Sequence, residues 1–260
     1  MSDFPSFPPN PDFGTGAYRR AIRVTNRPGE VFGELEDIIH AIRCTITHDG
    51  EVITDVDAAF VRWPMTTCPG AVQPIRELIG VRLDTPIAWF FTGGRARQNC
   101  THIYDMVIAM LLHARRDEAV RRYDVVIPDN VGDEPSRATL LRDGRPILEW
   151  RVSGGGEILS PETYAGRRVI RGFSSWATEA LDDEQLDAAL ILQKGYWQSG
   201  GRKVLIGSVG GPIRDQEAEF KGACYSYSSP RFERAERLPS WRDLSDGTRL
   251  LRFDPFGPER

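Results

Sequence analysis

The chain has 260 residues, of which 40% are hydrophobic and 27% are charged, the ordinary balance of a globular protein that buries a core. A formal net charge of −4 excludes a chain-wide basic field of the kind that attracts nucleic acid or an anionic membrane. No apolar run approaches the ~18–20 residues that span a bilayer, and the first ten residues lack the features of a secretory signal. We therefore expect a cytoplasmic protein with no nucleic-acid or membrane partner, and a homo-oligomer stays open.

The first half of the chain predicts strands followed by helices. Residues 1–17 are rich in proline and glycine and predict a flexible arm. Residues 18–64 alternate as strands do, and Asp49-Gly50 predicts a hairpin with a two-residue turn. That register pairs His48 with Glu51 and places His40, Cys44 and Asp55 on one face of the sheet. Helical spacing then predicts a short helix over 71–79 and a long one over 100–116.

The second half predicts more strands and one helix. Asp143-Gly144 predicts another hairpin within 138–152, a helix is expected at about 182–194, and strands are expected at 203–209 and 219–228. The fold class is α+β: an N-terminal antiparallel sheet with helices on one face, followed by a β-rich second part with one helix. The expected divisions are the arm at 1–17, an α+β domain at 18–122, a β-rich aromatic part packed on it at 123–238, and an irregular tail at 239–260.

The four cysteines, at 44, 68, 100 and 224, contain no Cys-x-x-Cys pair, and structural disulfides are not expected in a reducing cytosol. Cys44 and Cys224 are interpreted as small buried hydrophobic residues. Cys68 and Cys100 each stand at the start of an expected helix, where unpaired N–H groups favour the thiolate.

Such thiolates either bind zinc or act as nucleophiles. His102 lies beside Cys100 as a general acid or base, and Asp105, one turn further on, is expected to orient it. A tetrahedral site could take Asp37 or His40 together with Cys68, Cys100 and His102. The plainer interpretation is that Cys68 and Cys100 are buried helix caps and that His102 is a surface histidine. Zinc is the candidate cofactor, and otherwise none is expected.

A resemblance supports these positions. The motifs at residues 18–20, 35–40, 48–50, 67–71 and 100–105 resemble a bacterial domain-of-unknown-function family, number twenty-eight eighty-nine. The resemblance implies that His40, Cys68, Cys100, His102 and Asp105 match its characteristic motifs, and it implies no established activity. Cys44 is not part of the family's pattern, which favours its interpretation as a core residue.

The order of elements in the N-terminal half is also similar to the iron–sulfur scaffold fold. That second resemblance implies that a strand residue and two cysteines at helix starts converge on one metal. Asp37 or His40 would here replace the strand cysteine, and Cys68 lies farther past its strand than in that fold.

The favoured function is a small-molecule enzyme of the hydrolase, lyase or isomerase type. In this interpretation a Cys/His/Asp site of Cys100, His40, His102 and Asp105, with or without a metal, acts on an apolar or aromatic substrate. Trp150, Tyr164 and Trp176 would wall the substrate pocket. The alternative is a non-catalytic protein: an iron–sulfur or sulfur-transfer scaffold, or an accessory protein of a catabolic enzyme.

Overall fold

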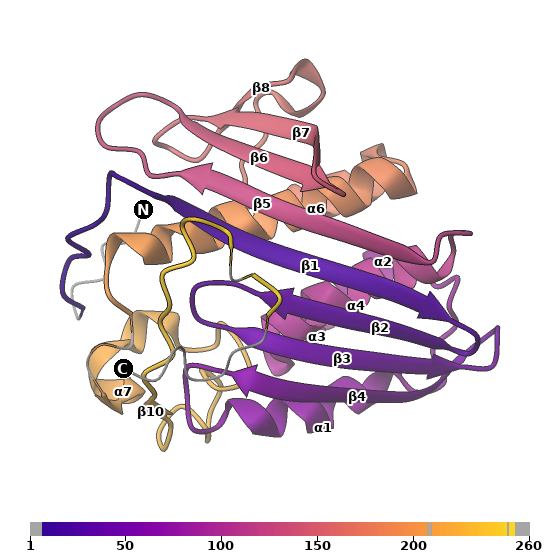
Figure 1. Ribbon diagram of the computed structural model, residues 1–260. Helices are drawn as coiled ribbons and strands as arrows, with labels where there is room; N and C mark the ends of the chain where they lie inside the picture. The colour runs from indigo at the N-terminus through magenta and orange to yellow at the C-terminus, as the bar shows by residue number, and fades with distance from the viewer. Residues whose placement is uncertain (1–6, 207, 209, 249, 253–260) are drawn as a thin grey trace.

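The computed structural model describes residues 7–206, 208, 210–248 and 250–252, and an eight-stranded antiparallel sheet runs through this part of the chain (Figure 1). The strand order is β4-β3-β2-β1-β5-β6-β7-β8, so the first strand of the chain lies in the middle of the sheet. The strands are β1 (Ala17–Arg27), β2 (Glu30–Glu36), β3 (Ala41–His48), β4 (Ile53–Arg62), β5 (Val120–Pro128), β6 (Ser136–Arg142), β7 (Arg145–Val152) and β8 (Ile158–Ser160). Two short strands, β9 (Gly211–Pro212) and β10 (Glu236–Arg237), pair separately.

Helices cover one face of this sheet. The two longest are α4 (Thr101–Ala114), which contacts β1, β2 and β3, and α6 (Asp183–Ser199), which contacts β1, β5, β6 and β7. Asp182 and Gln185 form a capping box that starts α6. The shorter helices are α1 (Val72–Ile75), α2 (Ile87–Phe90), α3 (Arg95–Gln98), α5 (Phe173–Ala180) and α7 (Ile213–Gln216). The 3₁₀ helices cover Cys68–Ala71, Arg76–Leu78, Glu162–Tyr164, Gly200–Lys203 and Ala218–Phe220.

The opposite face of the sheet is partly covered by the C-terminal segment, which crosses in front of the strands in Figure 1. Leu244, Leu250 and Leu251 are buried against Ala21 and Ala41. The α+β class is therefore confirmed. Within the described residues, no helix is both long and apolar enough to cross a bilayer.

The Asp143-Gly144 hairpin is confirmed. These two residues join β6 to β7, with φ values of 49° and 79° that suit a type I′ turn. The Asp49-Gly50 hairpin also exists, but its expected register is wrong. His48 pairs with Ile53 instead of Glu51, because the connection is longer than two residues.

The Asp49 carboxylate explains the longer connection. Its Oδ1 accepts the backbone N–H groups of Glu51 and Val52, both at 2.9 Å, and this holds the turn open. Cys44 therefore faces Ala58 and not Asp55. Moreover, His40 lies outside β3, in the connection from β2.

Two expected strands in the second half are absent from the described residues. Positions 207 and 209 of the first lie outside the described part of the chain, and residues 204–206 form no ladder, although Val204 makes one isolated bridge to Pro9. Residues 219–228 form a 3₁₀ helix and turns. Their backbone groups bond locally or to a distant loop, as Gly222 N–H does to Tyr227 O at 2.8 Å and Tyr225 N–H to Asn99 O at 2.9 Å.

Of the expected arm, residues 1–6 lie outside the described part of the chain, and the rest of the arm is packed. Residues 7–16 lie against the segment that follows α6: Phe7 is buried with Val204 and Ile206, and Asn10 N–H donates to Lys203 O at 2.9 Å. The boundary at 122/123 lies within β5, which pairs with β1. The likeness to the iron–sulfur scaffold fold is not supported, since the four N-terminal strands are half of one larger sheet.

Trp150, Tyr164 and Trp176, the residues expected to wall a substrate pocket, form one aromatic cluster with Phe173. Trp150 is 0% exposed, and its ring centroid lies 5.4 Å from those of Tyr164 and Phe173. Trp176 packs edge-on against Tyr164 and Phe173. These aromatic contacts join β7 to α5, which explains why the sequence concentrates large rings here.

We expect Trp150→Ala to lower the free energy of unfolding by about 3–5 kcal/mol, because it leaves a large cavity in the core. Urea unfolding followed by circular dichroism measures this. Trp197→Ala is the matched control: Trp197 is 42% exposed, so its loss should change stability by less than about 1 kcal/mol. Equal effects of the two substitutions would contradict the assignment of Trp150 to the core.

Candidate functional site

The loop between β2 and β3 positions two residues of the site. Asp37 Oδ1 accepts the backbone N–H groups of Ile39 at 2.9 Å and His40 at 2.8 Å. The Asp37 N–H in turn donates to His40 O at 2.9 Å. This arrangement is an Asx turn, in which a short acidic side chain replaces backbone partners. It holds Asp37 and His40 together at one end of the sheet.

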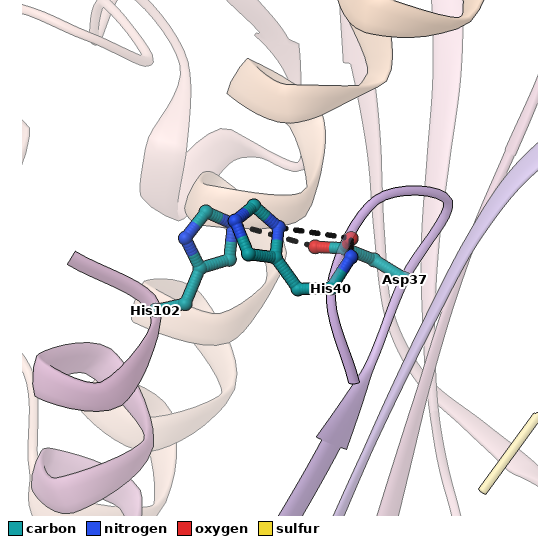
Figure 2. A group of neighbouring side chains, drawn as sticks. All are labelled: Asp37, His40 and His102. Carbon is teal, nitrogen blue, oxygen red and sulfur yellow. Dashed lines mark hydrogen bonds and ion pairs between the residues drawn. The ribbon is translucent and has the colours of Figure 1, made fainter. Parts of the chain in front are cut away.

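His102 reaches the same place from the first turn of α4, because α4 packs against β2 and β3. His40 Nδ1 lies 3.3 Å from Asp37 Oδ1, and His102 Nε2 lies 3.4 Å from Asp37 Oδ2 (Figure 2). The two imidazole rings are stacked, with centroids 3.6 Å apart and planes at 29°. Asp37, His40 and His102, all three of them candidate site residues from the sequence, thus lie in contact.

Burial and neighbouring charges set the ionisation of this group. Asp37 is 2% exposed. Burial opposes its ionisation, but the positive charge of His40 and the close approach of both imidazoles to the carboxylate outweigh burial and hold the pKa of Asp37 well below its usual range. Burial, reinforced by repulsion from His40, lowers the pKa of His102 to about 3. Near neutral pH, Asp37 is therefore a carboxylate and His102 a neutral imidazole.

Gln198, near the end of α6, is a further partner of His102. Its Nε2 lies 2.6 Å from His102 Nε2. Its Oε1 accepts hydrogen bonds from Arg20 Nη1 at 2.6 Å and from Tyr18 OH at 3.1 Å. No motif or spacing in the sequence links these three residues to His102, because they come from β1 and α6 and share no local pattern with it.

Asp37, His40 and His102 are of the right types to hold a divalent metal. One ligand atom from each lies within 4.8 Å of the others, the one such group found among the described residues. Ligands around tetrahedral zinc are about 3.3–3.4 Å apart, given Zn–N bonds near 2.0–2.1 Å, and the two His–Asp separations match that spacing.

The directions of the lone pairs fit a metal less well. A metal binds imidazole in the plane of the ring, and two rings stacked 3.6 Å apart at 29° keep their nitrogen lone pairs in separate, nearly parallel planes. The amide of Gln198 also occupies His102 Nε2. Binding an ion through all three residues therefore requires the rings to turn and Gln198 to withdraw.

Cys68 and Cys100 do not join this group, so the expected ligand set that included them is not formed. Burial raises the pKa of Cys68 to about 12, although Ser226 Oγ donates to its sulfur at 3.4 Å. Burial, reinforced by the neighbouring Cys68 and Cys224, raises the pKa of Cys100 well above its usual range. The expectation of helix-start thiolates is wrong here, because desolvation outweighs the helix N-terminus. Cys44, in contrast, is a core residue as expected.

Asp105 does not touch His102. Its Oδ1 forms an ion pair with Lys194 Nζ at 3.3 Å, because Asp105 faces α6 whereas His102 turns toward the β2–β3 loop. The expected direct role of Asp105 in orienting His102 is therefore wrong.

The site opens on a cavity of ≈ 530 Å³, within the usual range of about 300–1,000 Å³ for small-molecule sites. Asp37, His40 and His102 line it, and so do Cys68, Cys100 and Cys224. The aromatic part of its wall includes Phe7, Phe13, Tyr18, Tyr196, Trp197 and Tyr225. Trp150, Tyr164 and Trp176 are not among the described lining residues.

A family model described as "Protein of unknown function (DUF2889)" matches residues 23–115. This segment resembles that family. It runs from within β1 to the end of α4, and it contains Asp37, His40, Cys68, Cys100 and His102. Tyr18, Arg20 and Gln198 lie outside it. No curated protein matches the chain.

We expect the protein to lose stability as the pH falls from 7.5 to 5.0. In the unfolded chain His102 binds a proton near pH 6.5, whereas in the folded protein it stays neutral to about pH 3. At His102 the unfolded state therefore takes up more protons throughout this window, which costs about 2 kcal/mol at pH 5.0. Asp187, whose pKa burial raises to about 6, offsets part of this loss because its folded form binds the extra proton. Asp37, whose pKa is lowered, acts with the same sign as His102 only below its ordinary value of 3.8.

Urea unfolding at several pH values measures this dependence. His102→Gln should flatten the slope without removing it, since His113 is also buried and its pKa is lowered by burial. His48→Gln, at the hairpin lip, should leave the slope unchanged. A slope in His102→Gln as steep as in the unmodified protein would show that His102 is charged in the folded state.

Proposed function

We propose that the protein is a small-molecule enzyme of the hydrolase, lyase or isomerase type, in which Asp37 and His40 carry out proton transfer on an apolar or aromatic substrate. The observation that carries the proposal is a buried, ionised carboxylate beside His40 Nδ1 in the wall of a cavity of ligand size.

In this dyad of Asp37 and His40, the carboxylate would hold the imidazole so that one of its nitrogens can accept a proton. His40 Nδ1–H donates to Asp37 Oδ1, which leaves Nε2 of His40 as the proton acceptor. Once His40 accepts a proton, the adjacent carboxylate stabilises the imidazolium. The 3.3 Å separation is longer than an ideal charged hydrogen bond, but such contacts commonly shorten when substrate binds.

The cavity supports the substrate class. Aromatic side chains from four separate segments, 7–13, 18, 196–197 and 220–227, line it. Two of its charged groups are already paired: Asp129 with Arg202, and Glu217 with Arg237. The rest of the lining consists largely of aromatic rings, thiols and the Asp–His–His group, together with Asp133, Glu134 and Lys203. The aromatic share supports a weakly polar molecule with one reactive polar group as the substrate.

The thiols are assigned no nucleophilic role. With their pKa values raised, Cys68 and Cys100 are almost entirely protonated near neutral pH, and the thiolate is the reactive form. We propose that they shape the cavity wall instead.

His40→Gln and Asp37→Asn should each lower kcat/KM by at least about 10²-fold, the usual contribution of a positioned general base. Suitable assays are a panel of aryl and alkyl esters, amides and hydroxy or enolisable carbonyl compounds, with ligand binding measured separately by thermal shift. His48→Gln is the control for loss of a histidine away from the cavity. Undiminished turnover in His40→Gln would contradict the proposed role of Asp37 and His40 in proton transfer.

A metal-assisted enzyme is the second candidate, favoured by the closeness of the ligand atoms of Asp37, His40 and His102. These three residues would hold the ion, with zinc as the expected metal. A bound divalent metal would supply Lewis acidity and a more acidic bound water.

Metal analysis of purified protein separates the two candidates. The metal-assisted candidate predicts one equivalent of divalent metal, lost in His102→Gln and Asp37→Asn but retained in Cys100→Ser. Proton transfer by Asp37 and His40 predicts that activity survives removal of metal by a chelator. Activity that disappears with the chelator and returns with zinc would favour the metal.

A further inference from the structure

Arg20 is connected to His102 through one intermediate residue, Gln198. Arg20 lies in β1, is 1% exposed, and donates through Nη1 to Gln198 Oε1 at 2.6 Å. Tyr18, two residues earlier on the same face of the strand, donates to the same oxygen at 3.1 Å. Gln198 in turn meets His102 at 2.6 Å. A buried cation and a buried carboxylate thus lie at the two ends of one chain of side chains.

The donors and acceptors in this chain can be assigned from chemistry. A guanidinium has N–H donors and no acceptor. The Gln198 atom that faces Arg20 must therefore be the carbonyl oxygen. The other amide atom, which faces His102 Nε2, is then the NH₂ group, which can only donate. His102 Nε2 must accept this hydrogen bond, and the ring proton of neutral His102 then resides on Nδ1.

We infer that Arg20 and Gln198 are positioning residues that hold His102 in the tautomer with an unprotonated Nε2. The consequence falls on Asp37. If Nε2 carried a proton, His102 would donate to Asp37 Oδ2, 3.4 Å away, and both imidazoles would be oriented by the carboxylate. With Nε2 as an acceptor, His40 is the imidazole that Asp37 orients. The role of Asp37 in orienting His40 rests on the proposed function. The tautomer of His102 does not depend on that proposal.

A second observation shows what holds Arg20 in place. Its Nε and Nη2 atoms, and Asp105 Oδ2, are buried without a hydrogen-bond partner among the described residues. Arg20, Asp105 and Lys194 line a separate cavity of ≈ 10 Å³. Beyond its contact with Gln198, Arg20 is therefore held by burial in the wall of a small cavity that it shares with Asp105 and Lys194.

Gln198→Glu tests the assignment with little change in shape. The glutamate keeps an oxygen for Arg20 and Tyr18, and it gains an ion pair with Arg20. The atom facing His102 changes from a donor to an acceptor, so His102 Nε2 must acquire a proton. Nitrogen–hydrogen correlation spectra of the histidine rings locate that proton directly. We expect it on Nδ1 of His102 in the unmodified protein and on Nε2 in Gln198→Glu.

Gln185→Glu is the matched control, since Gln185 is exposed in the first turn of the same helix and glutamate also suits a capping box. It should leave the His102 spectrum unchanged. A proton on Nε2 in the unmodified protein overturns the inference, and so does a spectrum that Gln198→Glu does not alter. If Gln198→Glu fails to fold, the spectrum of the unmodified protein decides by itself.

The spectra need no substrate, so this result stands apart from the proposed enzyme activity. Full turnover in His40→Gln would refute the dyad and leave the tautomer of His102 as measured.

Discussion

The carboxylate of Asp37 is the charge on which the site depends. An isolated carboxylate buried to this degree would be strongly unfavourable, so its surroundings must supply hydrogen bonds and compensating charge. Two backbone N–H groups and His40 provide the hydrogen bonds. Arg62, itself buried and paired with Glu36, donates to the Asp37 backbone carbonyl at 2.8 Å. The loop is therefore held from both sides, and His40 has little freedom to leave the carboxylate.

The cavity beside this loop is lined more by the segments that connect helices and strands than by the helices and strands themselves. The sheet ends at the β2–β3 loop, and segments from the start, the middle and the end of the described chain line the space beyond it: residues 7–13, 129–134 and the described residues between 200 and 237. The buried ion pair of Glu217 with Arg237, joined by Tyr227 OH, anchors the last of these segments. The β2–β3 loop at the end of the sheet and the start of α4 thus present Asp37, His40 and His102, whereas other connecting segments determine the shape available to a ligand.

The sequence predicted features whose cause is local. Asp143-Gly144 needs only its own backbone conformation to form a hairpin, and the start of α4 follows from helical periodicity. The register after Asp49 was wrong because a side chain lengthened the turn. The reactive thiolates were wrong for a different reason. A helix N-terminus can be seen in sequence, whereas the desolvation of Cys68 and Cys100 depends on segments more than a hundred residues away. The meeting of Asp37 with His102 was foreseen as a candidate, but Gln198 was not, since a lone glutamine carries no signal of its own.

The residues of the site lie partly inside and partly outside the segment that the family model matches. Residues 23–115 contain the carboxylate and both imidazoles, while the residues that orient His102 lie before and after that segment. Within the segment, β1 would also lose β5 and change from the central strand to an exposed edge. The matched segment thus carries Asp37, His40 and His102 and holds the first two in place, whereas the Gln198 partner of His102 comes from outside it. Chains that share it with different flanking residues would keep the same three side chains but need not share their protonation, and so need not share their chemistry.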